Sequence, residues 1–235
     1  MHCSRLIVFV FALLATTATF AGMTSPLSLP QRVTATELIP FTSSRKEFKI
    51  IDGKDQGRLV SVTFQADATD EKRWKLSFGD YGRIFLRSTS GALIMDRLDL
   101  YKSKSYVLYE PALRVLPAEI ESASAVLRQT RYKMYSVETG KLRRAGRVTH
   151  IVKRISPSQF STPAGLIDGY HIEIEHKMEM EYNSQLMLTV GLGCRLDEGL
   201  VYGLAQYKLS KLGGLLTETK TTAAALSRRS FEPNS

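Results

Sequence analysis

The segment Tyr170–Tyr182 alternates strictly between two kinds of side chain, and this alternation constrains the fold more than any other feature of the chain. It reads YHIEIEHKMEMEY, with Tyr, Ile, Met or a single His at the even positions and Glu, Lys or His at the odd ones. Successive side chains of a β-strand point to opposite faces, so this period of two predicts a strand with one face in a core and one in water. Such one-sided burial is typical of antiparallel sheets, because parallel strands covered by helices are apolar on both faces.

Turn signals at regular spacing extend this prediction to most of the chain. They are Asp52-Gly53, Asp55-Gln56-Gly57, Gly79-Asp80-Tyr81-Gly82, Ser90-Gly91 and Thr139-Gly140, and the runs between them are rich in Val, Ile, Leu, Phe and Tyr. The second half offers long segments at 124–138, 141–155, 169–182, 186–196 and 200–211, with a sixth at 215–222. Strands of about 13 residues exceed the usual five or six and suit a strongly curved sheet.

We therefore predict a mainly β fold, a curved antiparallel meander sheet that is half-barrel or barrel-like, with one or two short helices. The best helical candidates are Pro117–Val126 and Thr221–Leu226, and a short edge strand is expected near Ala35–Phe41. As one domain, an all-β chain of this size can bury a full core, since sandwiches and barrels often reach roughly 200–250 residues.

The N-terminus has the layout of an export signal. An apolar run of ten residues, Leu6–Ala15, follows the single cation Arg5, and small residues precede Gly22. The alternative is a retained membrane anchor, but this run is about half the length that a bilayer span needs. A lipid anchor would require a cysteine just after the run, whereas Cys3 precedes it.

These features divide the chain into four parts. We expect a signal peptide at 1–21, an extended lead-in at 22–45, a single mostly antiparallel β domain at 46–226 and a flexible tail at 227–235. The mature protein is then secreted or periplasmic and keeps one cysteine, Cys194, which cannot form an internal disulfide and is expected to be a small buried apolar residue.

Two turn elements resemble a known layout. The element Thr162-Pro163-Ala164-Gly165, followed by Gly169-Tyr170 and later by Asp197-Glu198-Gly199-Leu200-Val201, resembles bacterial secreted domains of unknown function in which a TPAG turn opens a long strand. Those domains are similar to the half-barrel of periplasmic lipoprotein carriers, where a curved sheet cups an apolar groove. This chain departs from the group at Leu192-Gly193-Cys194-Arg195, which replaces an aromatic dipeptide. The resemblance covers roughly residues 117–222 and implies a half-barrel fold and hydrophobic-ligand or envelope-related binding, but no functional residues.

Charge is concentrated in one segment of the chain. Removal of residues 1–21 takes away one arginine, so the formal charge falls from +9 to +8, and the window 128–154 alone carries nine cations and one acid, Glu138. The cations are Arg128, Arg131, Lys133, Lys141, Arg143, Arg144, Arg147, Lys153 and Arg154. One hypothesis is a basic hairpin that faces an anionic partner such as phospholipid headgroups or a cell-wall polymer. The other is neutralisation across the sheet by the acidic strand 171–181.

The apolar face of the alternating strand gives a second candidate site. Its members are Ile172, Ile174, Met178 and Met180, which line either an apolar groove or the core that replaces it. On the same face His176 is expected to be a core histidine with a hydrogen-bond partner. His171 lies an odd five residues away and points to the opposite face, so this pair predicts no metal site, and no cofactor is expected.

Catalytic motifs are absent from the sequence. There is no G-x-S-x-G elbow, Gly191-x-Gly193 lacks the third glycine of a nucleotide loop, and the glutamates at 173, 175, 179 and 181 are expected to be the water-facing side of one strand. We therefore expect an exported, non-enzymatic envelope or extracellular protein that binds an apolar or amphipathic ligand or an anionic surface. Nucleic acid is the least favoured partner, because export removes the chain from it. The alternative is a hydrolase with a dispersed active site.

Overall fold

A computed structural model describes residues 32–39, 43–53, 55–70, 72–121, 126–180, 184–196, 198–211 and 214–226. The expected signal peptide, the tail and most of the lead-in lie outside these residues, as do the side chains of Arg32, Glu121, Arg154, Tyr207 and residues 215–217.

Strands make up nearly all of the described chain. The short elements are β1 (Arg32–Thr34), α2 (Ala35–Leu38), the 3-10 turn η1 (Tyr101–Ser103) and β8 (Glu119–Glu121). The longer strands are β2 (Ser44–Gly53), β3 (Leu59–Ala66), β4 (Arg73–Phe78), β5 (Gly82–Thr89), β6 (Ala92–Leu100), β7 (Ser105–Leu116), β9 (Val126–Ser136), β10 (Leu142–Thr162), β11 (Gly165–Met180), β12 (Ser184–Arg195), β13 (Gly199–Lys211) and β14 (Gly214–Ala225).

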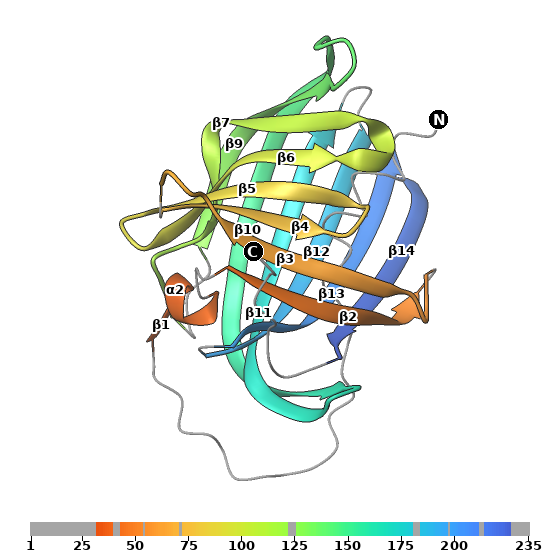
Figure 1. Cartoon of the computed structure of the whole chain (residues 1–235). Helices are drawn as coiled ribbons and strands as arrows, with labels where there is room; N and C mark the ends of the chain where they lie inside the picture. Colours follow the sequence, from red (N-terminus) through yellow and green to blue (C-terminus); the bar gives the residue numbers. More distant parts are fainter. Residues whose placement is uncertain are drawn as a thin grey trace.

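Twelve of these strands close into an antiparallel barrel. The order is β10-β11-β12-β13-β14-β2-β3-β4-β5-β6-β7-β9, and β9 pairs back onto β10 to complete the circle. In Figure 1, β3 to β7 run across the front while β11 to β14 run behind them at a steep slope, so the barrel has the form of two crossing layers. This confirms the prediction of a mainly β, barrel-like antiparallel meander.

The strand β11 has the alternating burial that its sequence predicts. Ile172, Ile174 and Met178 are at most 4% exposed, whereas Glu173 and Glu175 between them are partly exposed. Ile174 lies between Val152 of β10 and Val190 of β12, both buried. The even-numbered face of this strand therefore lies in the barrel interior, and the carboxylates lie outside.

Both expected helices are wrong. Glu119–Glu121 forms β8, which pairs with β1, and residues 122–125 lie outside the description. Thr221–Ala225 belongs to β14, where Ala223, Ala224 and Ala225 are fully buried against β2. Alanine favours helices, but strand pairing and complete burial outweigh that weak local preference here.

The expected edge strand near 35–41 is also wrong. Residues 35–38 form the helix α2, and the strand β1 ends just before it at Thr34. Thr34 and Glu37 form a capping box, in which the Thr34 side chain accepts from the Glu37 backbone and the Glu37 carboxylate accepts from the Thr34 backbone at 2.7 Å. The helix buries Ala35 and Leu38 in the core, so it covers part of the barrel.

Candidate functional site

The wall of the barrel is incomplete between β7 and β9. These strands pair from Ser105 with Ser136 as far as Glu110 with Arg131. Beyond that point the residues 111–116 of β7 and 126–130 of β9 have no ladder between them, although each strand remains paired on its other side. The interruption begins at Pro111, which has no backbone N–H to donate to a ladder.

Side chains replace part of the missing ladder. The Thr130 hydroxyl donates a hydrogen bond to the carbonyl of Pro111, and Nε2 of His150 lies 2.9 Å from the carbonyl of Val115. Thr130 and His150 are 7% and 2% exposed, so the two carbonyls are satisfied from within the wall. The two strands are therefore held near each other without being joined edge to edge.

A cleft of about 520 Å³ lies along this gap. Its described lining consists of Arg87, Thr89, Ile94, Pro111, Ala112, Leu113, Arg114, Arg128, Gln129 and Thr130. The apolar floor consists of Pro111, which is exposed, and Ala112, which is partly exposed, together with the more deeply buried Ile94 and Leu113, which are 6% and 1% exposed. Ile94 is paired with Arg87 on one side and with Arg114 on the other, so two guanidinium groups flank the apolar floor.

The three arginines of the cleft differ in their partners. Nε of Arg87 lies 2.9 Å from the Asp96 carboxylate, so its charge is balanced. Arg128 donates to the carbonyl of Leu127 at 3.0 Å, and within the described chain neither Arg114 nor Arg128 forms an ion pair. The cleft therefore presents two guanidinium charges without a carboxylate beside them, next to apolar surface.

Behind the cleft two histidines meet inside the wall. Nδ1 of His150 lies 3.2 Å from Nδ1 of His176, and both rings are buried. Because a carbonyl only accepts, His150 carries its proton on Nε2 toward Val115, which leaves its Nδ1 to accept from the Nδ1–H of His176. Burial lowers the pKa of His150 to about 4, and burial together with the neighbouring His150 lowers the pKa of His176 well below its ordinary value. Both rings are accordingly neutral at neutral pH.

The sequence suggested a comparison of His176 with His171, but the side chain that His176 contacts is that of His150. His171 lies on the outer face of β11, as its odd offset indicates, whereas His150 comes from β10 and is paired directly with His176. No group of three or more His, Cys, Asp or Glu side chains in the described residues is arranged to hold a metal ion.

Some cations of the basic segment are neutralised. Lys153 lies 3.0 Å from Glu173 and 3.5 Å from Glu175 on the acidic strand, and Lys133 lies 2.8 Å from Glu110 on β7. In both cases the carboxylate raises the pKa of the lysine. The single acid of the segment, Glu138, pairs instead with Lys104 at 2.6 Å.

The other cations of the segment have different surroundings. Arg131 and Arg147 are exposed and directly opposite each other on β9 and β10, and Arg144 contacts the sulfur of Met180 at 3.7 Å. Arg143 donates to the carbonyl of Ser103 and the hydroxyls of Ser105 and Ser136. Lys141 is exposed at the hairpin turn, and Arg154 is opposite Glu173 but its side chain is not described. Of the eight cations whose side chains are described, only Arg128 lines the cleft.

The apolar candidates belong to the core. Ile172, Ile174 and Met178 are buried in the main hydrophobic cluster, and Met180 is partly buried against it. The groove alternative for this face is therefore replaced by a packed interior, and the cleft is formed by other strands.

A second, much smaller cavity of about 20 Å³ lies near the α2 end of the barrel. Beside it Lys46 is 5% exposed, and its ammonium donates to the carbonyls of Glu198 and Leu200 at 2.9 and 3.2 Å. Burial lowers the pKa of Lys46. Such a volume holds about one water molecule, so it is no ligand site. Nearby Cys194 is fully buried, and burial raises its pKa to about 12, which keeps the thiol protonated.

Comparisons with known proteins add little. No family model and no curated protein matches the chain. A solved structure of a "putative lipoprotein" from Parabacteroides distasonis is 13% identical and covers 81% of this chain and 97% of its own, with a TM-score of 0.43. A likeness at that level carries no argument about function. No helix in the described residues has the length and apolar character to cross a bilayer.

Proposed function

We propose that the protein is exported and binds an anionic amphiphile in the cleft between β7 and β9, without catalysing a reaction. The anionic headgroup contacts Arg114 and Arg128, and the apolar part of the ligand covers Pro111 and Ala112. The single observation that supports this proposal is the juxtaposition of guanidinium groups that lack carboxylate partners with an apolar floor in one cleft.

The chemistry of the lining favours this class of ligand. Guanidinium groups bind carboxylates and phosphates through paired hydrogen bonds, and the apolar floor favours contact with hydrocarbon. A volume of about 520 Å³ lies within the range of small-molecule sites, roughly 300–1,000 Å³. Neither a purely apolar nor a purely ionic ligand would use both halves of the surface.

The same lining gives no support to the hydrolase alternative. Its described residues include hydroxyls only on Thr89 and Thr130, and both already take part in hydrogen bonds. General-base candidates are not among them, because His150 and His176 lie buried behind the cleft. A hydrolytic site needs a nucleophile within reach of a base, and this cleft does not bring the two together.

Calorimetric titration with dodecyl phosphate tests the proposal, with dodecanol as the neutral probe of equal chain length. We expect dodecyl phosphate to bind at least tenfold more tightly, since hydrogen bonds to charged groups contribute about 1.5–3 kcal/mol each and 1.4 kcal/mol is a factor of ten. The double variant Arg114→Glu/Arg128→Glu should lose this preference. Arg147→Glu, which reverses an exposed arginine outside the cleft, should keep it. Binding of neither probe, or equal binding of both, would contradict the proposal.

Export is tested separately. N-terminal sequencing of protein recovered from outside the cytoplasm of its own host should find a mature chain that begins near Gly22. A membrane-bound product that retains Met1 would rule out this part of the proposal without affecting the cleft.

A further inference from the structure

Two turns lie side by side at one end of the barrel. One is the connection between β6 and β7, which contains η1, and the other is the turn of the β9–β10 hairpin. The backbone N–H of Val137 donates to the carbonyl of Lys104 at 2.8 Å, and Arg143 donates to the carbonyl of Ser103 at 2.8 Å. These bonds fix the two turns to each other. We call the residues 101–104 and 137–143 the docking end.

The docking end exposes an unusual share of apolar side chains. Val137 is 57% exposed, Leu142 is 55% exposed and Tyr101 is 36% exposed. Three of the seven large exposed hydrophobic residues in the described chain therefore lie on these two adjacent turns. The remaining four, Leu59, Leu127, Leu166 and Met187, come from other parts of the barrel.

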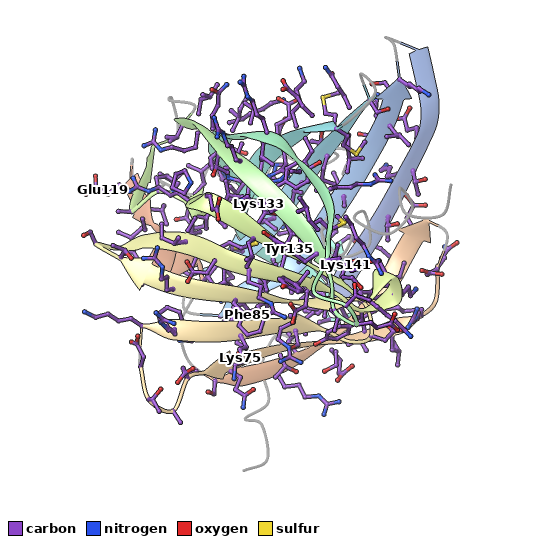
Figure 2. All side chains as sticks on the ribbon, turned by 90° about the horizontal axis from the view of Figure 1, so that it is seen from above. Lys75, Phe85, Glu119, Lys133, Tyr135 and Lys141 are labelled. Carbon is purple, nitrogen blue, oxygen red and sulfur yellow. The ribbon has the colours of Figure 1, made fainter. Side chains whose placement is uncertain are left out.

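Cations surround these apolar side chains. Lys102, Lys104, Lys141 and Arg143 belong to the same two turns, and the single carboxylate among them, Glu138, is paired with Lys104. Arg83 of β5 adds a further cation, since its guanidinium donates to the Tyr101 hydroxyl at 2.9 Å. Figure 2 shows Lys141 at the end of the β9–β10 hairpin, beyond Lys133 and Tyr135, with Glu119 on the opposite side of the view. The docking end thus carries exposed hydrocarbon within a field of positive charge.

We propose that the docking end binds the surface of an anionic phospholipid bilayer, with Val137 and Leu142 in the boundary between headgroups and acyl chains. Cations near such a surface are attracted by its anionic headgroups, and apolar side chains add to binding when they enter the boundary. A soluble polyanion would use the cations but gain nothing from the exposed aliphatic groups, so the combination favours a bilayer. No residue of the docking end lines the cleft, so this proposal is independent of the proposed function.

Co-sedimentation with vesicles tests the proposal. The full mature protein should bind vesicles that contain phosphatidylglycerol and phosphatidylcholine, and binding to phosphatidylcholine alone should be at least tenfold weaker and should fall with added salt. The variant Val137→Ser/Leu142→Ser should reduce binding at least about fivefold, because it removes apolar surface without changing charge. The matched control Leu127→Ser/Leu166→Ser removes two similarly exposed aliphatic side chains, 51% and 59% exposed, at the opposite end of the barrel and should bind like wild type.

A charge-reversal experiment tests the same proposal independently. Lys102→Glu/Lys141→Glu should reduce vesicle binding at least tenfold, whereas the control Arg45→Glu/Lys72→Glu, in exposed residues at the opposite end of the barrel, should have a smaller effect. The cleft variant Arg114→Glu/Arg128→Glu should retain most vesicle binding, which separates a failure of this proposal from a failure of the proposed function.

Fluorescence reports the depth of insertion. The single native tryptophan, Trp74, is 4% exposed, so a tryptophan introduced by Leu142→Trp gives the signal that changes. Its emission should shift to shorter wavelength with anionic vesicles and stay unchanged with soluble polyphosphate. Binding that polyphosphate abolishes and that Val137→Ser/Leu142→Ser does not affect would identify a polyanion site instead and overturn the bilayer proposal.

Discussion

The neighbouring strand pairs β10–β11 and β7–β9 both consist of long strands, but they pair to very different extents. β10 and β11 pair from Thr162 with Gly165 back to Val148 with Met178, interrupted by one irregularity near Lys153. β7 and β9 stop pairing after Glu110 and Arg131. The difference follows from the sequences, because alternation continues from Tyr170 to Met180 along β11 whereas Pro111 interrupts β7.

The two strand pairs also differ in how their charged and polar groups are satisfied. On β10–β11 the backbone satisfies itself, and Lys153 meets carboxylates on the neighbouring strand. On β7–β9 the Thr130 hydroxyl and the His150 ring satisfy backbone carbonyls, and the guanidinium groups of Arg114 and Arg128 lack carboxylate partners in the described chain. Complete pairing therefore closes the wall at β10–β11, where Lys153 is neutralised. Incomplete pairing between residues 111–116 of β7 and 126–130 of β9 leaves a gap bridged by polar side chains, which we call the seam, beside the cationic cleft.

The largest effect is expected from a substitution that places a charge inside the β10–β11 hairpin. Ile174→Asp places a carboxylate between buried valines of β10 and β12, where it has no partner, and should destabilise the fold by about 4 kcal/mol or more. Soluble expression and thermal melting measure this. Glu175→Asp, the same residue introduced one position along on the outer face, should be tolerated. Equal tolerance at both positions would mean that the two faces of β11 are not distinguished by burial.

The next largest effect is the loss of stability at low pH that follows from the buried His150 at the seam. The folded-state pKa of His150, about 4, lies below the ordinary value of 6.5, so the unfolded chain takes up its proton first as pH falls. The stability of the fold should therefore be complete above pH 6.5 and decline between pH 6.5 and 4, by up to about 3 kcal/mol for this group. Urea unfolding at a series of pH values measures the slope.

Matched variants assign that slope to the buried pair. His150→Gln/His176→Gln should flatten the decline, whatever its effect on stability at pH 7, because no buried imidazole remains to be protonated. His171→Gln, on the outer face of β11, should leave the decline unchanged. A slope that survives in the double variant would place the acid sensitivity elsewhere in the molecule.

Much of the β10–β11 hairpin was predictable, and little of the seam was. A period of two is a local signal, so the residues Tyr170–Met180 were sufficient to assign the strand and its buried face. Residues 221–225 misled because their alanine-rich sequence favours a helix, while pairing with β2 makes them a strand. Helix propensity is a local property and carries no information about the strand with which a segment pairs.

The cleft depends on residues that the sequence keeps far apart. Arg87, Ile94 and Arg114 come from three strands and meet only through their register. Charge clustering identified Arg128 but not Arg87 or Arg114, which lie outside the basic segment. The one local signal was Pro111 within an apolar run, since proline at that position indicates an interrupted ladder.

A smaller effect is expected when the side-chain hydrogen bond across the seam, from Thr130 to the carbonyl of Pro111, is removed. Thr130→Val removes the hydroxyl that donates to Pro111 and keeps the side-chain volume, so it should cost about 1 kcal/mol. Hydrogen exchange should show faster opening of the amides in 112–116 than in wild type, with β10–β11 unchanged. Thr149→Val, on the outer face of β10, serves as the control and should leave both regions as they were. Uniform acceleration across the barrel would mean that the seam is not a separate unit of opening.

The smallest effect concerns charge on the outer face. Lys153→Glu replaces two favourable contacts with Glu173 and Glu175 by like charges, and exposed pairs are worth at most about 1 kcal/mol, so the melting temperature should fall by a few degrees. Arg147→Glu, in the same segment, instead places a carboxylate opposite Arg131, so it should leave the melting temperature unchanged or slightly raise it. High salt should shrink both shifts, because these side chains are partly exposed. Equal destabilisation by the two reversals would show that the whole basic segment is neutralised within the barrel, and would leave no excess of positive charge on it for an anionic partner.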